Sequence, residues 1–109
     1  MTDKRITYTY VFVRKDLPIH AQIIQAGHAL HEAGFTQTRP NAACHLVLFE
    51  VSSERELLQI HSDLMRKGIW LELFFEPDYN NGEYTAMASS CLDSGDIARA
   101  SFSKYRLYS

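Results

Sequence analysis

The stretch from residue 11 to residue 34, VFVRKDLPIHAQIIQAGHALHEAG, reads as a strand, a charged turn and a helix in one continuous piece. Its first three side chains are β-branched or aromatic and favour a strand. Pro18 suits the first turn of the helix, and Gly34 suits a left-handed cap at its end. An open α/β fold usually keeps its site where polar groups line the end of a strand. This segment therefore limits both the fold and the place to look for function.

Periodic patterns along the rest of the chain predict the order strand, helix, strand, helix, strand, strand, helix. A capping box of Ser53 and Glu56 opens the second helix, Gly68 ends it, and the NNG sequence at 80–82 predicts a tight turn between the last two strands. The predicted strands span residues 6–13, 45–51, 69–75 and 84–89, and the first and last helices span residues 18–33 and 93–104. Residues 105–108 are expected to add a terminal extended piece.

Apolar residues occupy both faces of the first predicted strand, with Tyr8, Tyr10 and Phe12 on one face and Val11 and Val13 on the other. A strand of this kind is central and covered on both sides. The first helix carries an apolar stripe that we expect to face the core: Ile19, Ile23, Ala26, Leu30 and Ala33. The element order predicts a three-layer α/β/α domain with a mixed four-stranded sheet, because a helical crossover joins parallel strands and a hairpin joins antiparallel ones.

Size and composition limit the class of protein. A chain of 109 residues has room for one core, so we expect a single domain over residues 1–109. The net charge of −2 argues against a protein that coats polyanions in general, although a local basic cluster would suffice for RNA. No apolar run approaches the length of a membrane span. Cys44 and Cys91 share no CxxC or metal-type spacing, so they are interpreted as reduced residues of a cytosolic protein.

Three polar side chains, Gln22, Gln25 and His28, follow one another at spacings of three along the first helix. They either hydrogen-bond to loop backbone or line a cleft that positions a polar substrate, and the sequence leaves both interpretations open.

Two carboxylates, Glu76 and Asp78, directly follow the third strand. In this place they can act as a general base or orient water, but they can equally cap the turn that Pro77 begins, which is the simpler interpretation for a single residue. Thr85, across the hairpin, either faces the same cleft or serves as a β-forming residue.

Cations and histidines near the first helix allow two further interpretations. Arg14 and Lys15, with Arg39 in the next loop, can hold phosphates, although such residues are usually a solvated surface. His28 and His31, in the sequence HALHE, suggest a metal site. Their order does not match H-E-x-x-H and no third ligand is visible, so a solvated helix face is favoured and no metal is assigned.

Taken in order, these motifs resemble the peptidyl-tRNA hydrolases of the second type, small α/β enzymes typical of archaea and eukaryotes. The family has R-x-D-L after its first strand and Q-C-x-H-A on its first helix, similar to VFVRKDL and QAGHA here. The similarity continues in VSSERELL at 51–58, FFE at 74–76 and GEYT at 82–85, so it covers about residues 8–92. The chain is identified as a divergent, bacterial-style member of this family.

The resemblance implies hydrolysis of the ester that joins a peptide to the 3′ end of tRNA by an activated water molecule. It implies tRNA as a partner, a cytoplasmic location and no metal or organic cofactor. It also implies a homodimer, which Tyr105 and Tyr108 of the tail would suit. The residues implied as catalytic are His20, Glu76, Asp78 and Thr85. Those implied as substrate-binding are Arg14, Lys15, Gln22, Gln25 and His28.

One departure bears on the reaction. The family's catalytic lysine corresponds to Ala21, in a loop that is two residues shorter, and His20 is the nearest group that can replace it. The family's aspartate corresponds best to Glu76, with Asp78 as a shifted alternative. The alternative function is a catalytically inactive binding module of the same fold that binds an RNA end, a nucleotide or a protein partner. A hydrolase of another small ester or amide is a third possibility.

Overall fold

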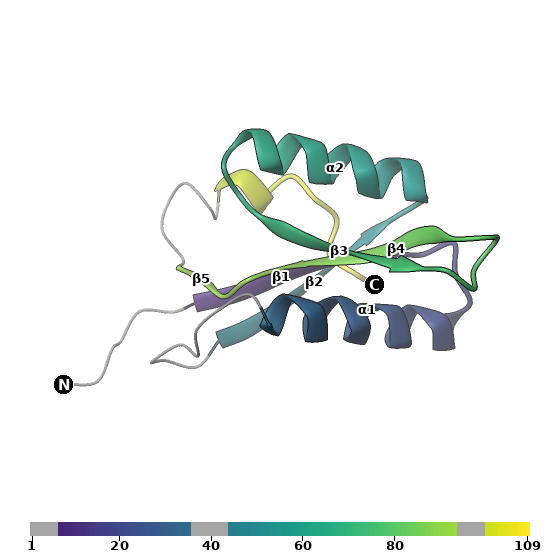
Figure 1. Ribbon diagram of the computed structural model, residues 1–109. Coiled ribbons are helices and arrows are strands. Elements are labelled where there is room, and N and C mark those ends of the chain that lie inside the picture. Colours follow the sequence, from purple (N-terminus) through teal and green to yellow (C-terminus); the bar gives the residue numbers. More distant parts are fainter. Residues whose placement is uncertain (1–6, 36–43, 94–99) are drawn as a thin grey trace.

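The computed structural model describes residues 7–35, 44–93 and 100–109. Its strands are β1 (Thr7–Arg14), β2 (Cys44–Val51), β3 (Leu71–Glu76), β4 (Glu83–Ser89) and the two-residue β5 (Leu92–Asp93), and its helices are α1 (Ile19–Gly34) and α2 (Glu54–Arg66). The strand order is β2-β1-β4-β3, and β5 also pairs with β1. β1 and β2 are parallel, whereas β4 is antiparallel to both of its neighbours. Figure 1 shows α2 on one face of the sheet and α1 on the other. The predicted three-layer arrangement around a mixed sheet is therefore confirmed.

The central place of β1 is also confirmed. Tyr10 and Phe12 belong to a larger core beneath α2 that includes Leu57, whereas Val11 and Val13 belong to a smaller, alanine-rich core beneath α1. Each face of the strand is thus covered by a different helix, as its two apolar faces require.

The predicted core stripe of α1 is wrong in part. The buried residues of this helix are Gln22, Gln25, Ala29 and Ala33. Ile19 and Ile23 are instead 68% and 71% exposed. The helix is rotated so that its glutamines are buried, and each of them is hydrogen-bonded. Gln22 donates to the Leu17 carbonyl of the β1–α1 loop, and Gln25 donates to Glu76 of β3. The expected left-handed cap at Gly34 is wrong as well, because the helix ends through Phe35 in a right-handed conformation.

Local signals elsewhere are confirmed. The Ser53 hydroxyl oxygen accepts a hydrogen bond from the Glu56 N–H at 3.1 Å, and the Glu56 carboxylate accepts one from the Ser52 N–H at 3.0 Å. The hairpin residues Asn80, Asn81 and Gly82 all have positive φ. Such backbone favours asparagine and glycine, so the NNG sequence predicts this turn correctly.

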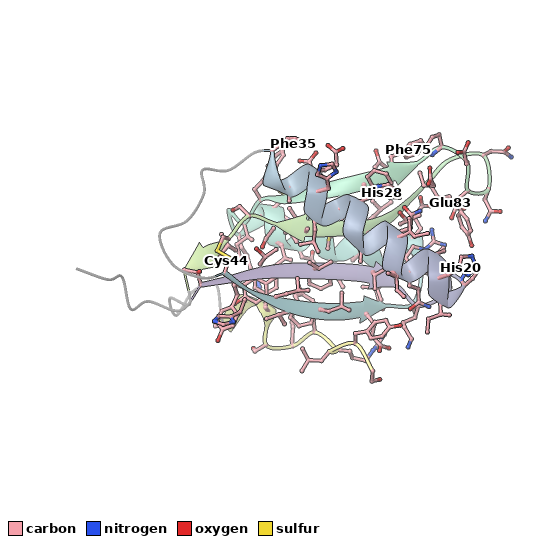
Figure 2. All side chains as sticks on the ribbon, turned by 90° about the horizontal axis from the view of Figure 1, so that it is seen from below. His20, His28, Phe35, Cys44, Phe75 and Glu83 are labelled. Carbon is pink, nitrogen blue, oxygen red and sulfur yellow. A yellow bond between two sulfur atoms is a disulfide. The ribbon has the colours of Figure 1, made fainter. Side chains whose placement is uncertain are left out.

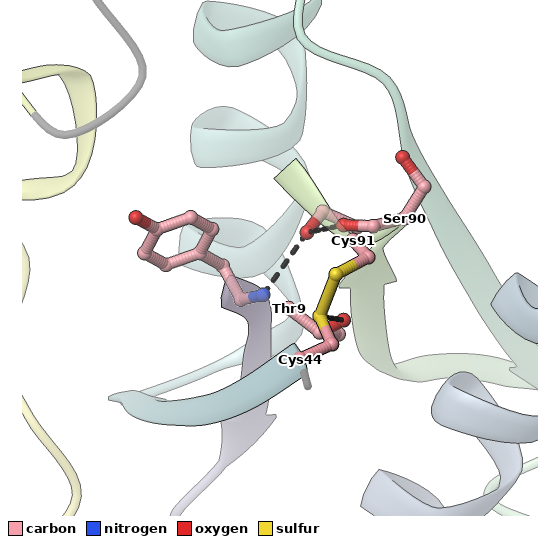
Figure 3. The surroundings of a disulfide bond; sticks show 6 residues. Thr9, Cys44, Ser90 and Cys91 are labelled. Carbon is pink, nitrogen blue, oxygen red and sulfur yellow. Dashed lines mark hydrogen bonds between the residues drawn. A yellow bond between two sulfur atoms is a disulfide. The ribbon is translucent and has the colours of Figure 1, made fainter. Parts of the chain in front are cut away.

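Cys44 and Cys91 form a disulfide bond, so their interpretation as reduced cysteines is corrected (Figure 3). They lie 47 residues apart, but β2 and β5 both pair with Thr7 of β1 and carry the cysteines to a Cα–Cα distance of 6.0 Å. The Ser89 hydroxyl beside the bond accepts a hydrogen bond from the Tyr10 N–H at 3.0 Å, where the pairing of β1 passes from β4 to β5. Spacing along the sequence carries no information on a contact made through a third strand.

The chain ends along the outer edge of β2. Leu107 forms an antiparallel bridge with Phe49, and the Tyr108 N–H donates to the Leu48 carbonyl at 2.9 Å, which confirms the predicted extended piece. Within the predicted last helix, residues 100–102 are helical, Asp93 belongs to β5, and 94–99 lie outside the described residues. The predicted loop 36–42, with Arg39, lies outside them too. No helix in the described ranges is long and apolar enough to cross a membrane.

Candidate functional site

A β-bulge places Thr85 on the α1 face of the sheet. Phe74 pairs with Ala86 and Phe75 pairs with Tyr84, so Thr85 is an extra residue between the two pairs. Ala86 packs in the core beneath α1, whereas Tyr84 packs against the core beneath α2. Thr85 hydrogen-bonds to a residue of α1, so two consecutive residues of β4 face the same helix. Bulges often redirect a side chain beside an active site.

The side chain of Gln25 joins Thr85 to Glu76. The Thr85 hydroxyl donates to Gln25 Oε1 at 2.7 Å, and Gln25 Nε2 donates to Glu76 Oε1 at 3.2 Å. A carboxylate accepts hydrogen bonds only, so the amide nitrogen must face Glu76 and the amide oxygen must face Thr85. The three residues come from β4, α1 and β3 and form one directed chain of hydrogen bonds, which we call the Thr85–Gln25–Glu76 chain.

Glu76 lies at the solvent end of this chain. Thr85 is fully buried, Gln25 is nearly so, and Glu76 is partly exposed at the carboxyl end of β3. Its second carboxylate oxygen has no partner among the described residues, so that oxygen is open to a water molecule. A partly exposed carboxylate held by a buried amide can accept a proton from such a water molecule.

The structure does not bring the other two residues implied as catalytic into this chain. His20 is exposed on the first turn of α1 and Asp78 is exposed in the turn after β3. In the described part of the molecule, neither hydrogen-bonds to Glu76 or Thr85. His20 lies at the same end of α1 as the β1–α1 loop, at one end of the molecule in Figure 2.

Arg14 is buried and is held by two carboxylates. It is 5% exposed, its Nε and Nη2 donate to Asp16, and its Nη1 donates to Glu83 at 2.7 Å and to the Tyr84 carbonyl. The hydrogen bonds with Asp16, together with the one to Glu83, outweigh the effect of burial and raise the pKa of the guanidinium above its usual value. The geometry therefore gives no support to Arg14 as a phosphate contact. It makes Arg14 a link between the β1–α1 loop and the β3–β4 hairpin.

Lys15 and Gln22 hold the chain's last residues. Lys15 Nζ donates to the Ser109 carbonyl at 2.7 Å and lies 4.4 Å from the centre of the Tyr108 ring. Gln22 Nε2 donates to the Leu17 carbonyl at 2.8 Å, and its amide oxygen accepts from the Tyr108 hydroxyl at 2.5 Å. Of the two interpretations left open for Gln22, the structure supports hydrogen bonding to loop backbone rather than the lining of a substrate cleft.

His28 stacks on Phe74 of β3, with 4.6 Å between ring centres, and so borders the strand that carries Glu76. His28, His31 and Glu32 are all exposed. Among the described residues, no group of three or more histidine, cysteine, aspartate or glutamate side chains is placed to hold a metal ion.

Sequence reasoning identified Gln25, Glu76 and Thr85 separately, but it missed their direct connection and the roles of Asp16 and Glu83. The connection depends on the bulge at Thr85, for which the sequence carries no signal. The sequence held a weak signal for one acidic partner, because Arg14 and Asp16 are two residues apart and can meet across a turn.

Comparisons with known proteins support the fold alone. No family model matches the sequence, and no curated protein matches it significantly. The structure is similar to that of a protein of unknown function, Atu0240, from Agrobacterium tumefaciens strain C58. The TM-score is 0.67 at 15% sequence identity, over 94% of this chain and 98% of that chain. At this identity the likeness concerns the α/β fold and carries no residue roles.

Proposed function

We propose that this chain is an esterase similar to the peptidyl-tRNA hydrolases of the second type and shares their fold. In the proposed reaction Glu76 activates the attacking water. The Thr85–Gln25–Glu76 chain is the observation that supports the proposal. It fixes one carboxylate oxygen by a buried amide and leaves the other open at the sheet edge. A fixed carboxylate at the carboxyl end of a strand is a usual form of general base in α/β enzymes.

In the proposed reaction, Glu76 takes a proton from water, and the resulting hydroxide attacks the ester carbonyl carbon. The tetrahedral intermediate then breaks the bond to the 3′ oxygen of the tRNA, and the proton on Glu76 returns to that oxygen. Thr85 is a positioning residue, because its proton is directed at Gln25 rather than outward. His20, exposed on the first turn of α1, is the proposed donor to the oxyanion.

A binding module without catalysis is the second candidate function. The contacts that Arg14 and Lys15 already make within the chain favour it. Arg14 is neutralised by Asp16 and Glu83, and Lys15 is engaged by the chain's last residues. Buried Arg14 is therefore not free to contact the phosphates of an acceptor stem, which normally supply much of the affinity for nucleic acid, and Lys15 already donates one hydrogen bond within the chain.

The two candidates are separated by hydrolysis of an N-acetylated aminoacyl-tRNA. We expect the wild-type protein to release the acetylated amino acid and Glu76→Gln to lower the rate by about 100-fold, in the range usual for a general base. Glu72→Gln is the matched control, because Glu72 lies on the same strand and, by alternation, on the same face. Its rate is expected to stay within about twofold of wild type.

The positioning residues have their own test. Thr85→Val and His20→Ala should lower the rate less than Glu76→Gln. Thr85→Ser keeps the hydroxyl that donates to Gln25, so its rate should be close to that of wild type. A folded wild-type protein with no activity, or an undiminished rate in Glu76→Gln, contradicts the catalytic proposal. A peptidyl-tRNA substrate implies a cytoplasmic location, where cellular thiols oppose disulfides. The assay is therefore run both with and without a reductant.

A further inference from the structure

We infer that the outer edge of β3 binds the peptide part of the substrate as an added parallel strand, an inference that rests on the proposed function. β3 is the last strand in the order β2-β1-β4-β3, and within the described residues it pairs with β4 alone. Figure 1 looks onto this edge, with α2 on one side of it and α1 on the other. The backbone N–H and C=O groups of every second residue point away from β4 there. We call this surface, residues 71–76, the β3 edge.

The two outer edges of the sheet differ in their backbone pairing. The outer edge of β2 is paired with the chain's own tail, through Leu107 and Tyr108. Among the described residues, no such segment pairs with the outward side of β3. The sequence of β3, LELFFE, also contains neither proline nor lysine, two residues that commonly keep an edge strand from pairing. The β3 edge is therefore available to an extended chain from another molecule.

The position of Glu76 identifies that chain and its direction. Glu76 is the last residue of β3, so a strand added at this edge ends beside the proposed general base. A parallel peptide brings its C-terminal ester to Glu76. An antiparallel peptide would bring the ester to Leu71 instead, about 17 Å away at about 3.3 Å per residue. The peptide of a peptidyl-tRNA whose ester lies at Glu76 can thus follow β3 back toward Leu71.

Aromatic side chains border the β3 edge on both faces of the sheet. Phe75 is 46% exposed and meets the Tyr84 ring edge-on, on the side of α2. On the side of α1, the exposed His28 ring stacks on Phe74. Figure 2 shows Phe75 at this edge and His28 on the adjacent side of α1. The side chains of an added strand point alternately to the two faces, so they would meet one ring or the other.

This mode of binding selects peptides by length rather than by sequence. Hydrogen bonds between main chains supply the affinity when a strand is added to a sheet edge, and every peptide offers the same main-chain groups. A single amino acid offers too few of them. Binding at a distance from the ester also speeds the reaction, because it holds the ester at Glu76. The β3 edge therefore favours peptidyl-tRNA over a tRNA that carries one amino acid.

Hydrolysis of tRNAs that carry one to six alanine residues, each N-acetylated, tests the inference. We expect kcat/KM to rise by about 10-fold between one and four residues, as a few added hydrogen bonds allow, and then to level off. Two N-methylated four-residue substrates provide a matched pair, one with its first and third amides methylated and one with its second and fourth. Only the set that faces β3 should abolish the rise. Exchange of alanine for serine or valine should change kcat/KM by less than about threefold.

A second measurement does not depend on the reaction. Acetylated tetra-alanine amide has no ester, and at millimolar concentration we expect it to shift the amide resonances of β3 in the wild-type protein. The amides of β2 are the control, because the tail already pairs with that edge, and their resonances should not move.

The two measurements separate the β3 edge from the esterase. Shifted β3 resonances without hydrolysis of any tRNA would support peptide binding at this edge and contradict the esterase. Hydrolysis with unshifted β3 resonances would leave the esterase and overturn the inference, whether or not the rate depends on peptide length. A rate that is independent of peptide length, or that falls equally with both methylated substrates, also overturns it.

Discussion

Arg14 donates two hydrogen bonds to the carboxylate of Asp16, from Nε to Oδ1 at 2.9 Å and from Nη2 to Oδ2 at 2.6 Å. The third donor of the guanidinium, Nη1, reaches Glu83 at 2.7 Å in the hairpin that carries Thr85. Arg14 at the end of β1 and Glu83 at the start of β4 therefore join two parts of the chain that are 69 residues apart in the sequence.

Removal of this cation is expected to destabilise the fold. Arg14→Met leaves two carboxylates without a partner, which usually costs about 3–5 kcal/mol for fully buried groups. Both carboxylates retain some contact with water, so we expect a loss of about 2 kcal/mol, measured by urea unfolding. Arg66→Met is the control, because its pair with Asp63 is exposed, and it should change stability by less than about 0.5 kcal/mol. Equal effects of the two variants would contradict the role given to Arg14.

The hairpin turn is expected to require glycine at position 82. Gly82 has φ +106°, and a Cβ atom built there would lie 2.5 Å from Cζ of Phe75. Gly82→Ala must adopt strained backbone and displace the Phe75 ring from its edge contact with Tyr84, so we expect a loss of about 2 kcal/mol. Gly27→Ala provides the opposite result, since this helical glycine has open space around it and alanine should stabilise α1 by about 1 kcal/mol. Thermal unfolding of the two variants compares them directly.

Reduction of the disulfide is expected to lower stability without changing the fold. The Cys44–Cys91 bond closes a segment of 47 residues, and the loss of chain entropy in the unfolded state corresponds to about 4 kcal/mol. We expect urea unfolding with a reductant to show a loss of up to this size. A Cys44→Ser/Cys91→Ser double variant should unfold at the same urea concentration with or without the reductant. A wild-type protein that is insensitive to reductant would show that the bond contributes nothing.

The hydroxyl of Tyr105 gives the molecule a pH dependence at alkaline pH. This oxygen is buried with no hydrogen-bond partner in the described part of the chain. Burial, and then the nearby Asp63, raise the pKa of Tyr105 above its usual value near 10. Unfolded tyrosine therefore loses its proton at a lower pH than the folded residue, so stability falls as the pH rises above about 10.

Substitution of this tyrosine provides the measurement. Tyr105→Phe should unfold at neutral pH with a free energy equal to wild type or up to about 1 kcal/mol higher, because an unpaired buried hydroxyl is removed. Its stability should also fall less steeply between pH 9 and pH 11 than that of wild type, as followed by circular dichroism. A steeper fall in the variant would place the ionising group elsewhere.

The sequence predicted the features of the fold that depend on neighbouring residues. The alternation along β1 gave both of its faces correctly, and the capping box at Ser53 and the NNG turn have structures that local hydrogen bonds and backbone preferences dictate. These signals extend over three to eight residues, so no distant contact can easily override them.

The remaining features depend on contacts between distant strands. The bulge at Thr85, the disulfide across β1 and the rotation of α1 toward its glutamines are each fixed by the register of the sheet, which no local pattern records. The stripe containing Ile19 and Ile23 illustrates the limit: its period identifies an apolar face of the helix, but not which of these residues the sheet buries.

The pairing of residues 106–108 with the outer edge of β2 has a consequence for how this protein meets its own copies. An open strand edge offers unpaired N–H and C=O groups, and such edges nucleate aggregates by adding strands from other molecules. Here the C=O of Leu48 already accepts from the Tyr108 N–H, and the N–H of Glu50 already donates to the Arg106 carbonyl. The tail therefore closes this stretch of edge to sheet growth, so contact between molecules there must use side chains rather than a shared backbone ladder.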